Sequence, residues 1–152
     1  MFELINTKAD LSKLEIIAKN IAKKVKKGDI FLLNGELGVG KTTFARFFIK
    51  CIFKKNSLSP PNLIKSPSFP IMINYSIPSC EIYHYDLYRL KNEEEIEELN
   101  FFENFKENIT LIEWPEVIAN KNRLIKYYNI KMDIINQTYR NIKIYHTHIK
   151  NF

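Results

Sequence analysis

Apolar residues recur along the first third of this chain in two spacings, which predict helices alternating with strands. From residue 10 to about residue 26 they recur at helical spacing, so the pattern predicts a helix capped by Asp10 or Ser12 and ended by Gly28. The stretch "DIFLLN", residues 29–34, contains the continuous apolar run typical of a strand buried in a parallel sheet. A second helical spacing follows in "KTTFARFFIKCIF".

The remaining sequence is richer in strand patterns. Residues 69–77 and 81–90 predict two strands joined in a hairpin by Pro78 and Ser79. Residues 92–105 predict a helix with an acidic first turn, which suits the positive end of the helix dipole.

Three more strands complete the predicted fold. Residues 109–114 predict a buried strand, and residues 129–136 and 140–149 predict a late antiparallel pair. With a short strand at residues 2–5, this order predicts an α/β fold with a mixed, largely parallel central sheet flanked by helices. The length predicts a single domain over residues 1–152.

Composition narrows the class of protein. Apolar runs of only a few residues predict no membrane span, and the first residues lack a signal-peptide pattern, so we expect a cytoplasmic protein. The net charge of +6 permits nucleic-acid binding, but scattered lysines without an RNA-recognition motif favour an ordinary solvated surface. The serine- and proline-rich segment 54–68 predicts a loop, and loops of this length inside a compact domain are usually functional.

The stretch "GELGVGKTTF", residues 35–44, carries the clearest chemical signal. Gly35, Gly40, Lys41 and Thr42 match the phosphate-binding pattern G-x-x-x-x-G-K-[ST], between a predicted strand and a predicted helix. In such a loop, glycines let backbone amides wrap a phosphate, the lysine reaches the β- and γ-phosphates, and the hydroxyl of the following residue binds Mg²⁺. The sequence therefore predicts a site for nucleotide phosphates and Mg²⁺ in a P-loop domain.

A P-loop enzyme also needs a carboxylate at the end of a neighbouring strand to hold the magnesium. Glu113 follows "ITLI" and Asp86 follows "IYHY", so both are candidates. We favour Glu113, with Thr42, as the metal ligands, and Asp86 as the group that orients the attacking water or supports the site. Lys41, Asp86 and Glu113 are thus the predicted catalytic residues.

Five stretches occur in order along the chain: the glycine loop, "SPSF" at residues 66–69, "YHYDLYRL" at 83–90, "EELNFFENF" at 97–105 and "LIEWPE" at 111–116. Together they resemble the TsaE family, the small P-loop ATPases of bacterial tRNA threonylcarbamoyladenosine biosynthesis. The resemblance implies slow ATP hydrolysis in support of TsaB and TsaD, which place a threonylcarbamoyl group on adenosine 37 of tRNAs that read ANN codons. It allows an indirect contact with tRNA through that complex, and whether the protein itself contacts tRNA stays open.

The resemblance also implies site residues. It adds Thr7 and Arg140 beside the nucleotide, so that the expected nucleotide-binding residues are Thr7, Gly35, Glu36, Leu37, Gly38, Val39, Gly40, Lys41, Thr42, Thr43 and Arg140. Two departures from the family pattern keep the relevant chemistry: Ser68 retains the hydroxyl of a threonine, and Asn100 replaces a glycine while tolerating left-handed backbone.

Several alternatives stay open at this stage. The chain could be a small nucleoside or metabolite kinase, although it lacks an arginine-rich lid, or a module that distinguishes ATP from ADP without useful hydrolysis. Arg89 could stabilise γ-phosphate charge or pair with the acidic run at residues 93–98. For Trp114, the single tryptophan, we expect a packing role.

Overall fold

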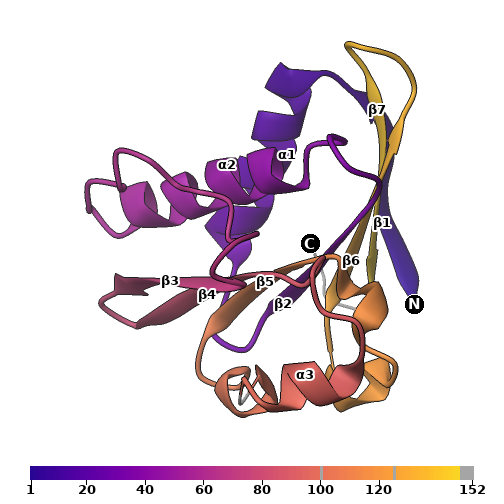
Figure 1. Ribbon diagram of the computed structural model, residues 1–152. Helices are drawn as coiled ribbons and strands as arrows, with labels where there is room; N and C mark the ends of the chain where they lie inside the picture. Colours follow the sequence, from indigo (N-terminus) through magenta and orange to yellow (C-terminus); the bar gives the residue numbers. More distant parts are fainter. Residues whose placement is uncertain (100, 125, 148–152) are drawn as a thin grey trace.

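The computed structural model describes residues 1–99, 101–124 and 126–147, and within them one seven-stranded sheet forms the centre of the molecule (Figure 1). The strands are β1 (Phe2–Ala9), β2 (Ile30–Asn34), β3 (Met72–Ile77), β4 (Cys80–Asp86), β5 (Ile109–Glu113), β6 (Tyr128–Ile134) and β7 (Arg140–His146). The α-helices are α1 (Leu11–Lys24), α2 (Lys41–Lys55) and α3 (Glu93–Glu97), and the 3₁₀ helices are η1 (Phe101–Asn104), η2 (Pro115–Val117) and η3 (Lys121–Leu124).

The strand order is β1-β7-β6-β2-β5-β4-β3. The four central strands, β6, β2, β5 and β4, run parallel, and the outer pairings are antiparallel. This confirms the predicted α/β fold with a mixed sheet that is parallel at its centre. Because the carboxyl ends of parallel strands meet at one edge, β2, β5 and β4 deliver the residues that follow them to a common place.

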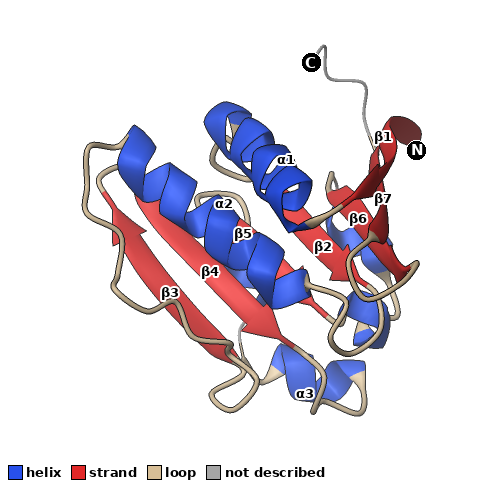
Figure 2. Ribbon diagram, turned by 90° about the horizontal axis from the view of Figure 1, so that it is seen from above, coloured by secondary structure: helices blue, strands red, loops and turns tan. Residues whose placement is uncertain are grey.

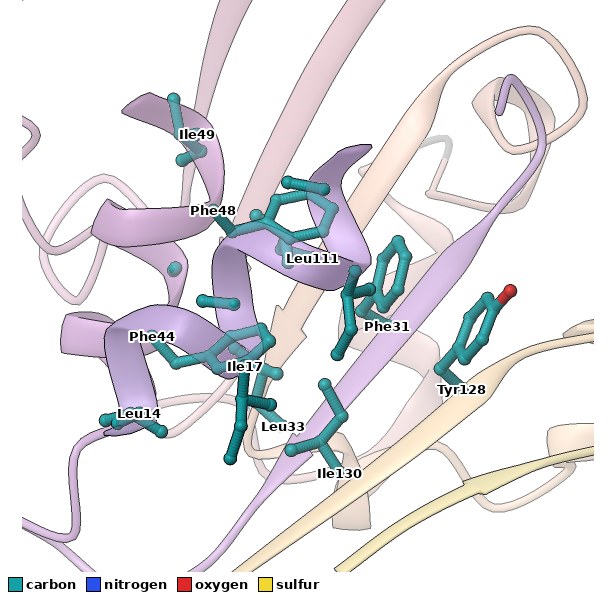
Figure 3. Packing of buried hydrophobic residues seen from close by; sticks show 14 of the residues in the cluster. Leu14, Ile17, Phe31, Leu33, Phe44, Phe48, Ile49, Leu111, Tyr128 and Ile130 are labelled. Carbon is teal, nitrogen blue, oxygen red and sulfur yellow. The ribbon is translucent and has the colours of Figure 1, made fainter. Parts of the chain in front are cut away.

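Two apolar layers hold the sheet between its helices. Helices α1 and α2 cover one face, while α3 lies against the other (Figures 1 and 2). Alternate residues of β2 enter opposite layers, with Phe31 and Leu33 under α1 and α2 and Ile30 and Leu32 on the side of α3. Figure 3 shows the first layer, where Phe44 and Phe48 of α2 interleave with the sheet residues. The predicted buried strand over residues 29–34 is therefore confirmed.

The early elements follow the prediction closely. The carboxylate of Asp10 accepts a hydrogen bond from the backbone N–H of Lys13, so Asp10 is the cap of α1, which ends at Lys24 rather than at residue 26. Strand β1 runs to Ala9, beyond the predicted residues 2–5, because it pairs with β7 along nearly its whole length. A partner 130 or more residues away cannot be found from local spacing.

The predicted helix over residues 92–105 is wrong in extent. The structure has the short α3 and then η1, and Asn100 lies outside the described residues. Phe101 and Phe105 are buried against Tyr85 and the other residues of the second layer, so tertiary packing sets the backbone there. The crowded carboxylates of the acidic run also repel one another along a helix.

The later strands agree with the prediction apart from their ends. The hairpin of β3 and β4 and the antiparallel pair of β6 and β7 are both present. Strand β4 stops at Asp86 instead of continuing to residue 90, and β7 ends at His146, with residues 148–149 of the predicted strand outside the described part. In the described ranges, no helix has the length and apolar character needed to cross a membrane.

Candidate functional site

The glycine loop connects the carboxyl end of β2 to the start of α2, as the pattern predicted. Gly35 has a φ of 143°, and a Cβ atom there would lie 2.5 Å from the carbonyl oxygen of Met132 on β6. Gly40, with a φ of 118°, occupies the cap position of α2. The loop therefore passes close to a neighbouring strand in a conformation that side-chain-bearing residues rarely adopt.

Lys41 folds back onto this loop. Its Nζ donates hydrogen bonds to the carbonyl oxygens of Gly35, at 2.6 Å, and Glu36, at 3.0 Å, and lies 3.8 Å from the ring centre of Trp114. Burial lowers the pKa of the Lys41 amine, against the opposing influence of Glu113 and other nearby carboxylates. Lys41 is thus a buried lysine that donates its hydrogen bonds to carbonyl oxygens of its own loop. It occupies the position at which the motif requires a contact with phosphate.

Thr42, Glu113 and His84 form one hydrogen-bonded chain that runs from half-buried Thr42 to two buried side chains. The Thr42 hydroxyl donates to Oε2 of Glu113 at 2.9 Å, and Nε2 of His84 lies 2.8 Å from Oε1 of the same carboxylate. Glu113 is 2% exposed and His84 is fully buried. Glu113 is therefore held from both sides, with one oxygen turned toward the first turn of α2.

Asp86 lies beside Glu113, because the two residues pair at the carboxyl ends of β4 and β5. Its Oδ1 accepts a hydrogen bond from the backbone N–H of Tyr88 at 3.1 Å. Burial raises the pKa of the Asp86 carboxyl, and the neighbouring Glu113 adds to that effect. Both carboxylates predicted from strand ends are thus brought together with the glycine loop.

These groups line one cleft at the carboxyl edge of the sheet. Ser66 and Ser68, from the loop predicted over residues 54–68, also line it. Arg46 on α2 holds this loop in place, because its Nε donates a hydrogen bond to the carbonyl oxygen of Ile64. The lining residues are Leu37, Gly38, Gly40, Lys41, Thr42, Thr43, Ser66, Ser68, Asp86, Tyr88, Glu113 and Trp114.

Thr7 and Arg140 lie on β1 and β7, outside that lining. The Thr7 hydroxyl accepts a hydrogen bond from Nζ of Lys13 at 2.6 Å. Arg140 instead contacts the glycine loop, because its Nε donates a hydrogen bond to the carbonyl oxygen of Val39 at 3.0 Å. The roles predicted for both residues beside a nucleotide stay predictions.

Trp114 and Arg89 have contacts that sequence reasoning did not supply. Trp114 follows β5 with a left-handed backbone (φ 57°) and its ring lies 4.8 Å from that of Tyr88. Such a conformation is strained for a bulky residue and is often found where a side chain must be aimed into a site. The guanidinium of Arg89 lies over the ring of Phe69, and the ion pairs with Glu93 and Glu97 that the sequence left open for Arg89 are made by Arg123 instead.

The donor set of the cleft suits a small, hard cation better than a transition metal. Over the part of the chain that the structure describes, no three His, Cys, Asp or Glu side chains gather as a metal cluster. The Thr42 hydroxyl and the Glu113 carboxylate nevertheless converge within 2.9 Å, and Mg²⁺ typically uses one or two such oxygens and completes its shell with water and phosphate. The residues present therefore fit the predicted cation.

A glycine loop between a central parallel strand and a helix, facing carboxylates on two neighbouring strands, defines a P-loop NTPase-type α/β domain. The sequence matches the family model described as "Threonylcarbamoyl adenosine biosynthesis protein TsaE" over residues 8–146. The chain belongs to the TsaE family.

Similar proteins agree with this assignment. The chain is 46% identical to the tRNA threonylcarbamoyladenosine biosynthesis protein TsaE of Rickettsia felis over 117 residues, which is 77% of this chain and 64% of that protein. It is 50% identical to the protein of the same name from Rickettsia typhi over 103 residues, 68% of each chain, and 37% identical to that of Bacillus subtilis over 106 residues, 69% of this chain and 62% of the relative. The chain thus spans about two thirds of the length of these relatives.

One solved structure confirms the fold. The crystal structure of YdiB from Bacillus subtilis superposes with a TM-score of 0.66 and covers 95% of this chain and 86% of its own. The sequence identity in that alignment is 24%, so this likeness bears on the fold alone.

Proposed function

We propose that this protein is a magnesium-dependent ATPase that acts with TsaB and TsaD to form threonylcarbamoyladenosine at position 37 of tRNAs that read ANN codons. The observation that carries the proposal is the contact between the Thr42 hydroxyl and the Glu113 carboxylate at 2.9 Å, directly beside the loop lysine. Membership of the TsaE family supports the pathway and the partners.

Each residue of the cleft has a role in this proposal. The backbone amides of residues 35–40 and the ammonium of Lys41 bind the phosphates of ATP, and Lys41 exchanges the carbonyls of Gly35 and Glu36 for phosphate oxygens. Thr42 and Glu113 hold Mg²⁺, which neutralises charge on the phosphates when bound. Asp86 accepts a hydrogen bond from the attacking water and orients it; its raised pKa favours proton acceptance.

The arginines of the chain speak against the kinase alternative. A small-molecule kinase usually closes a lid with arginines over the phosphates. Here Arg46 donates to Ile64, Arg89 lies over the ring of Phe69, Arg123 pairs with Glu93 and Glu97, and Arg140 donates to Val39. None of these contacts is with a residue that lines the cleft, which favours hydrolysis by water over phosphate transfer by a kinase.

One assay tests the proposal. Phosphate release from magnesium-ATP is measured on the wild type, Lys41→Ala and Glu113→Ala, each with and without TsaB and TsaD. We expect slow release by the wild type, a faster rate with the partners, and loss in both variants. Transfer of phosphate to an added nucleoside would instead support a kinase, and a partner complex that still cycles with Lys41→Ala would support a nucleotide-reading module without useful hydrolysis.

A further inference from the structure

A second cavity lies at the opposite end of β2 from the glycine loop. It has a volume of about 260 Å³. It lies between the turn before β2, the residues from Phe102 to Lys106, and the end of η3 with Lys126. The lining residues are Lys27, Gly28, Ile30, Phe102, Phe105, Lys106, Arg123, Leu124 and Lys126. None of them lines the cleft described above.

The floor of this cavity is apolar and partly aromatic. Ile30 and Leu124 are buried at 3% and 2% exposure, and Phe105 is buried at 6%. The ring of Phe102 lies 5.8 Å from that of Phe105 at an interplanar angle of 80°. The Arg123 guanidinium lies 3.6 Å from the centre of the Phe102 ring, so a flat apolar group that entered here would pack among two aromatic rings and that cation.

The rim of the cavity is positively charged, and no acidic side chain is among its described lining residues. Arg123 is compensated by Glu93 and Glu97, and Lys27 only weakly by Glu107, which is 4.0 Å away and 83% exposed. The remaining two cations of the rim are Lys106 and Lys126.

Lys106 and Lys126 have no carboxylate partner among the residues that the structure describes. They come from different segments but line the same cavity. Two uncompensated ammonium groups above an apolar floor attract a negative charge, and they favour a ligand that places that charge at the rim.

We propose that this cavity binds a small ligand in which an aromatic ring carries one anionic group. The ring lies against Phe102 and Phe105, and the anion is held by Lys106 and Lys126. The inference goes beyond the proposed ATPase function, and only the use of magnesium-ADP in its test draws on that function. The five residues of β2 separate the two sites by about 17 Å, at roughly 3.4 Å per residue, so occupation of one leaves the other open.

The test uses two dyes of similar shape, the anionic 1-anilinonaphthalene-8-sulfonate and the neutral N-phenyl-1-naphthylamine. Their affinities are measured by fluorescence titration in the presence of saturating magnesium-ADP, which occupies the P-loop cleft. The variant carries Lys106→Glu and Lys126→Glu, and the matched control carries Lys50→Glu, an exposed lysine on α2 far from the cavity. Thermal unfolding and ADP binding, measured on each variant, verify the fold.

We expect the double variant to bind the anionic dye at least about tenfold more weakly than the wild type, with the neutral dye within about twofold. The Lys50→Glu protein should bind both dyes as the wild type does. An unchanged affinity of the double variant for the anionic dye, an equal loss with Lys50→Glu, or an equal loss for both dyes would overturn the proposal. A negative result with the dyes would not contradict the proposal of ATP hydrolysis, because the phosphate-release assay reports on the P-loop cleft.

Discussion

The side-chain nitrogen of Lys41 lies 3.8 Å from the ring centre of Trp114 while it donates hydrogen bonds to two carbonyl oxygens of its own loop. A cation over an indole ring is attracted by the negative face of the ring. The lysine is thus held inside the loop by two carbonyl oxygens, and the proposed contact with phosphate would draw its ammonium group away from them.

The first prediction uses Trp114 as a reporter, since it is the single tryptophan of the chain. Titration with magnesium-ATP should change the tryptophan emission, because the ammonium of Lys41 moves relative to the indole. The half-saturation point should agree with the dissociation constant from calorimetry. Lys41→Met, which keeps the length of the side chain without its charge, should show no such change. Constant emission of the wild type during binding seen by calorimetry would contradict the prediction.

The second prediction separates the two carboxylates. Glu113→Gln should abolish the magnesium dependence of ATP affinity and reduce phosphate release by roughly 100-fold, because the proposed metal ligand is lost. Asp86→Asn should also slow phosphate release but keep magnesium-dependent binding, since the proposal gives Asp86 the role of orienting the water. Equilibrium binding with and without magnesium distinguishes them. If Asp86→Asn loses the magnesium dependence and Glu113→Gln keeps it, the two roles must be exchanged.

The third prediction concerns His84, which lies 2.8 Å from Glu113 and is fully buried. His84→Ala should reduce the free energy of unfolding by about 2 kcal/mol, because it leaves a buried carboxylate oxygen without its donor. In a Glu113→Ala background the same substitution should cost clearly less, since the acceptor is already gone. Urea denaturation of the four proteins gives this coupling. Equal costs in both backgrounds would show that the contact contributes nothing to stability.

The sequence was most informative where function is encoded locally. The loop, its lysine and threonine, and the strand ends that carry Asp86 and Glu113 each depend on a few consecutive residues, so spacing alone located them. Arg140 shows the opposite case: its contact with the Val39 carbonyl joins residues about 100 positions apart. No local pattern could indicate that an arginine on β7 donates a hydrogen bond to the glycine loop.

The sequence did not predict the backbone conformation of Trp114 or that of the segment around η1, for related reasons. The left-handed backbone of Trp114 aims its ring at Lys41, and a bulky residue gives no sequence signal for that conformation. The predicted helix over residues 92–105 followed the acidic pattern, but the burial of Phe101 and Phe105 determined the backbone instead. Local propensity is a weak guide wherever tertiary packing competes with it.

The fourth prediction follows from the raised pKa of the Asp86 carboxyl, which burial causes. The folded state binds the proton more tightly than the unfolded state, so ionisation of Asp86 costs stability as the pH rises above the unfolded value of about 3.9. Asp86→Asn should therefore be more stable than the wild type at pH 7, and this advantage should disappear below about pH 4.

Urea denaturation of the wild type and Asp86→Asn at several pH values between about 4 and 7 tests whether the variant is the more stable protein at the higher pH. Asp133→Asn is the matched control, since Asp133 is an exposed aspartate on β6, and it should show no comparable gain at pH 7. A wild type more stable than Asp86→Asn at pH 7, with the difference shrinking on acidification, would mean that the ionised carboxylate is stabilised in the fold and would contradict the prediction.

The fifth prediction compares two glycines of the loop that differ in their surroundings. Gly35 and Gly38 both have positive φ angles, of 143° and 76°, so alanine is strained at either position. A Cβ atom at Gly38 would meet nothing within 4 Å, whereas at Gly35 it would lie 2.5 Å from the backbone oxygen of Met132 and 2.8 Å from Val39. The oxygen belongs to the hydrogen-bonded strand β6, so it cannot easily move aside.

Gly38→Ala should therefore cost about 1 kcal/mol of unfolding free energy, the strain of the backbone alone. Gly35→Ala should cost about 3 kcal/mol, because its φ of 143° lies farther from the left-handed region that alanine can adopt and the Cβ atom overpacks against β6. Urea denaturation without nucleotide measures both, so that any effect on ATP binding does not enter. Equal costs would mean that the loop withdraws from β6 without penalty, and the close approach of Gly35 to Met132 would then not be what requires glycine at this position.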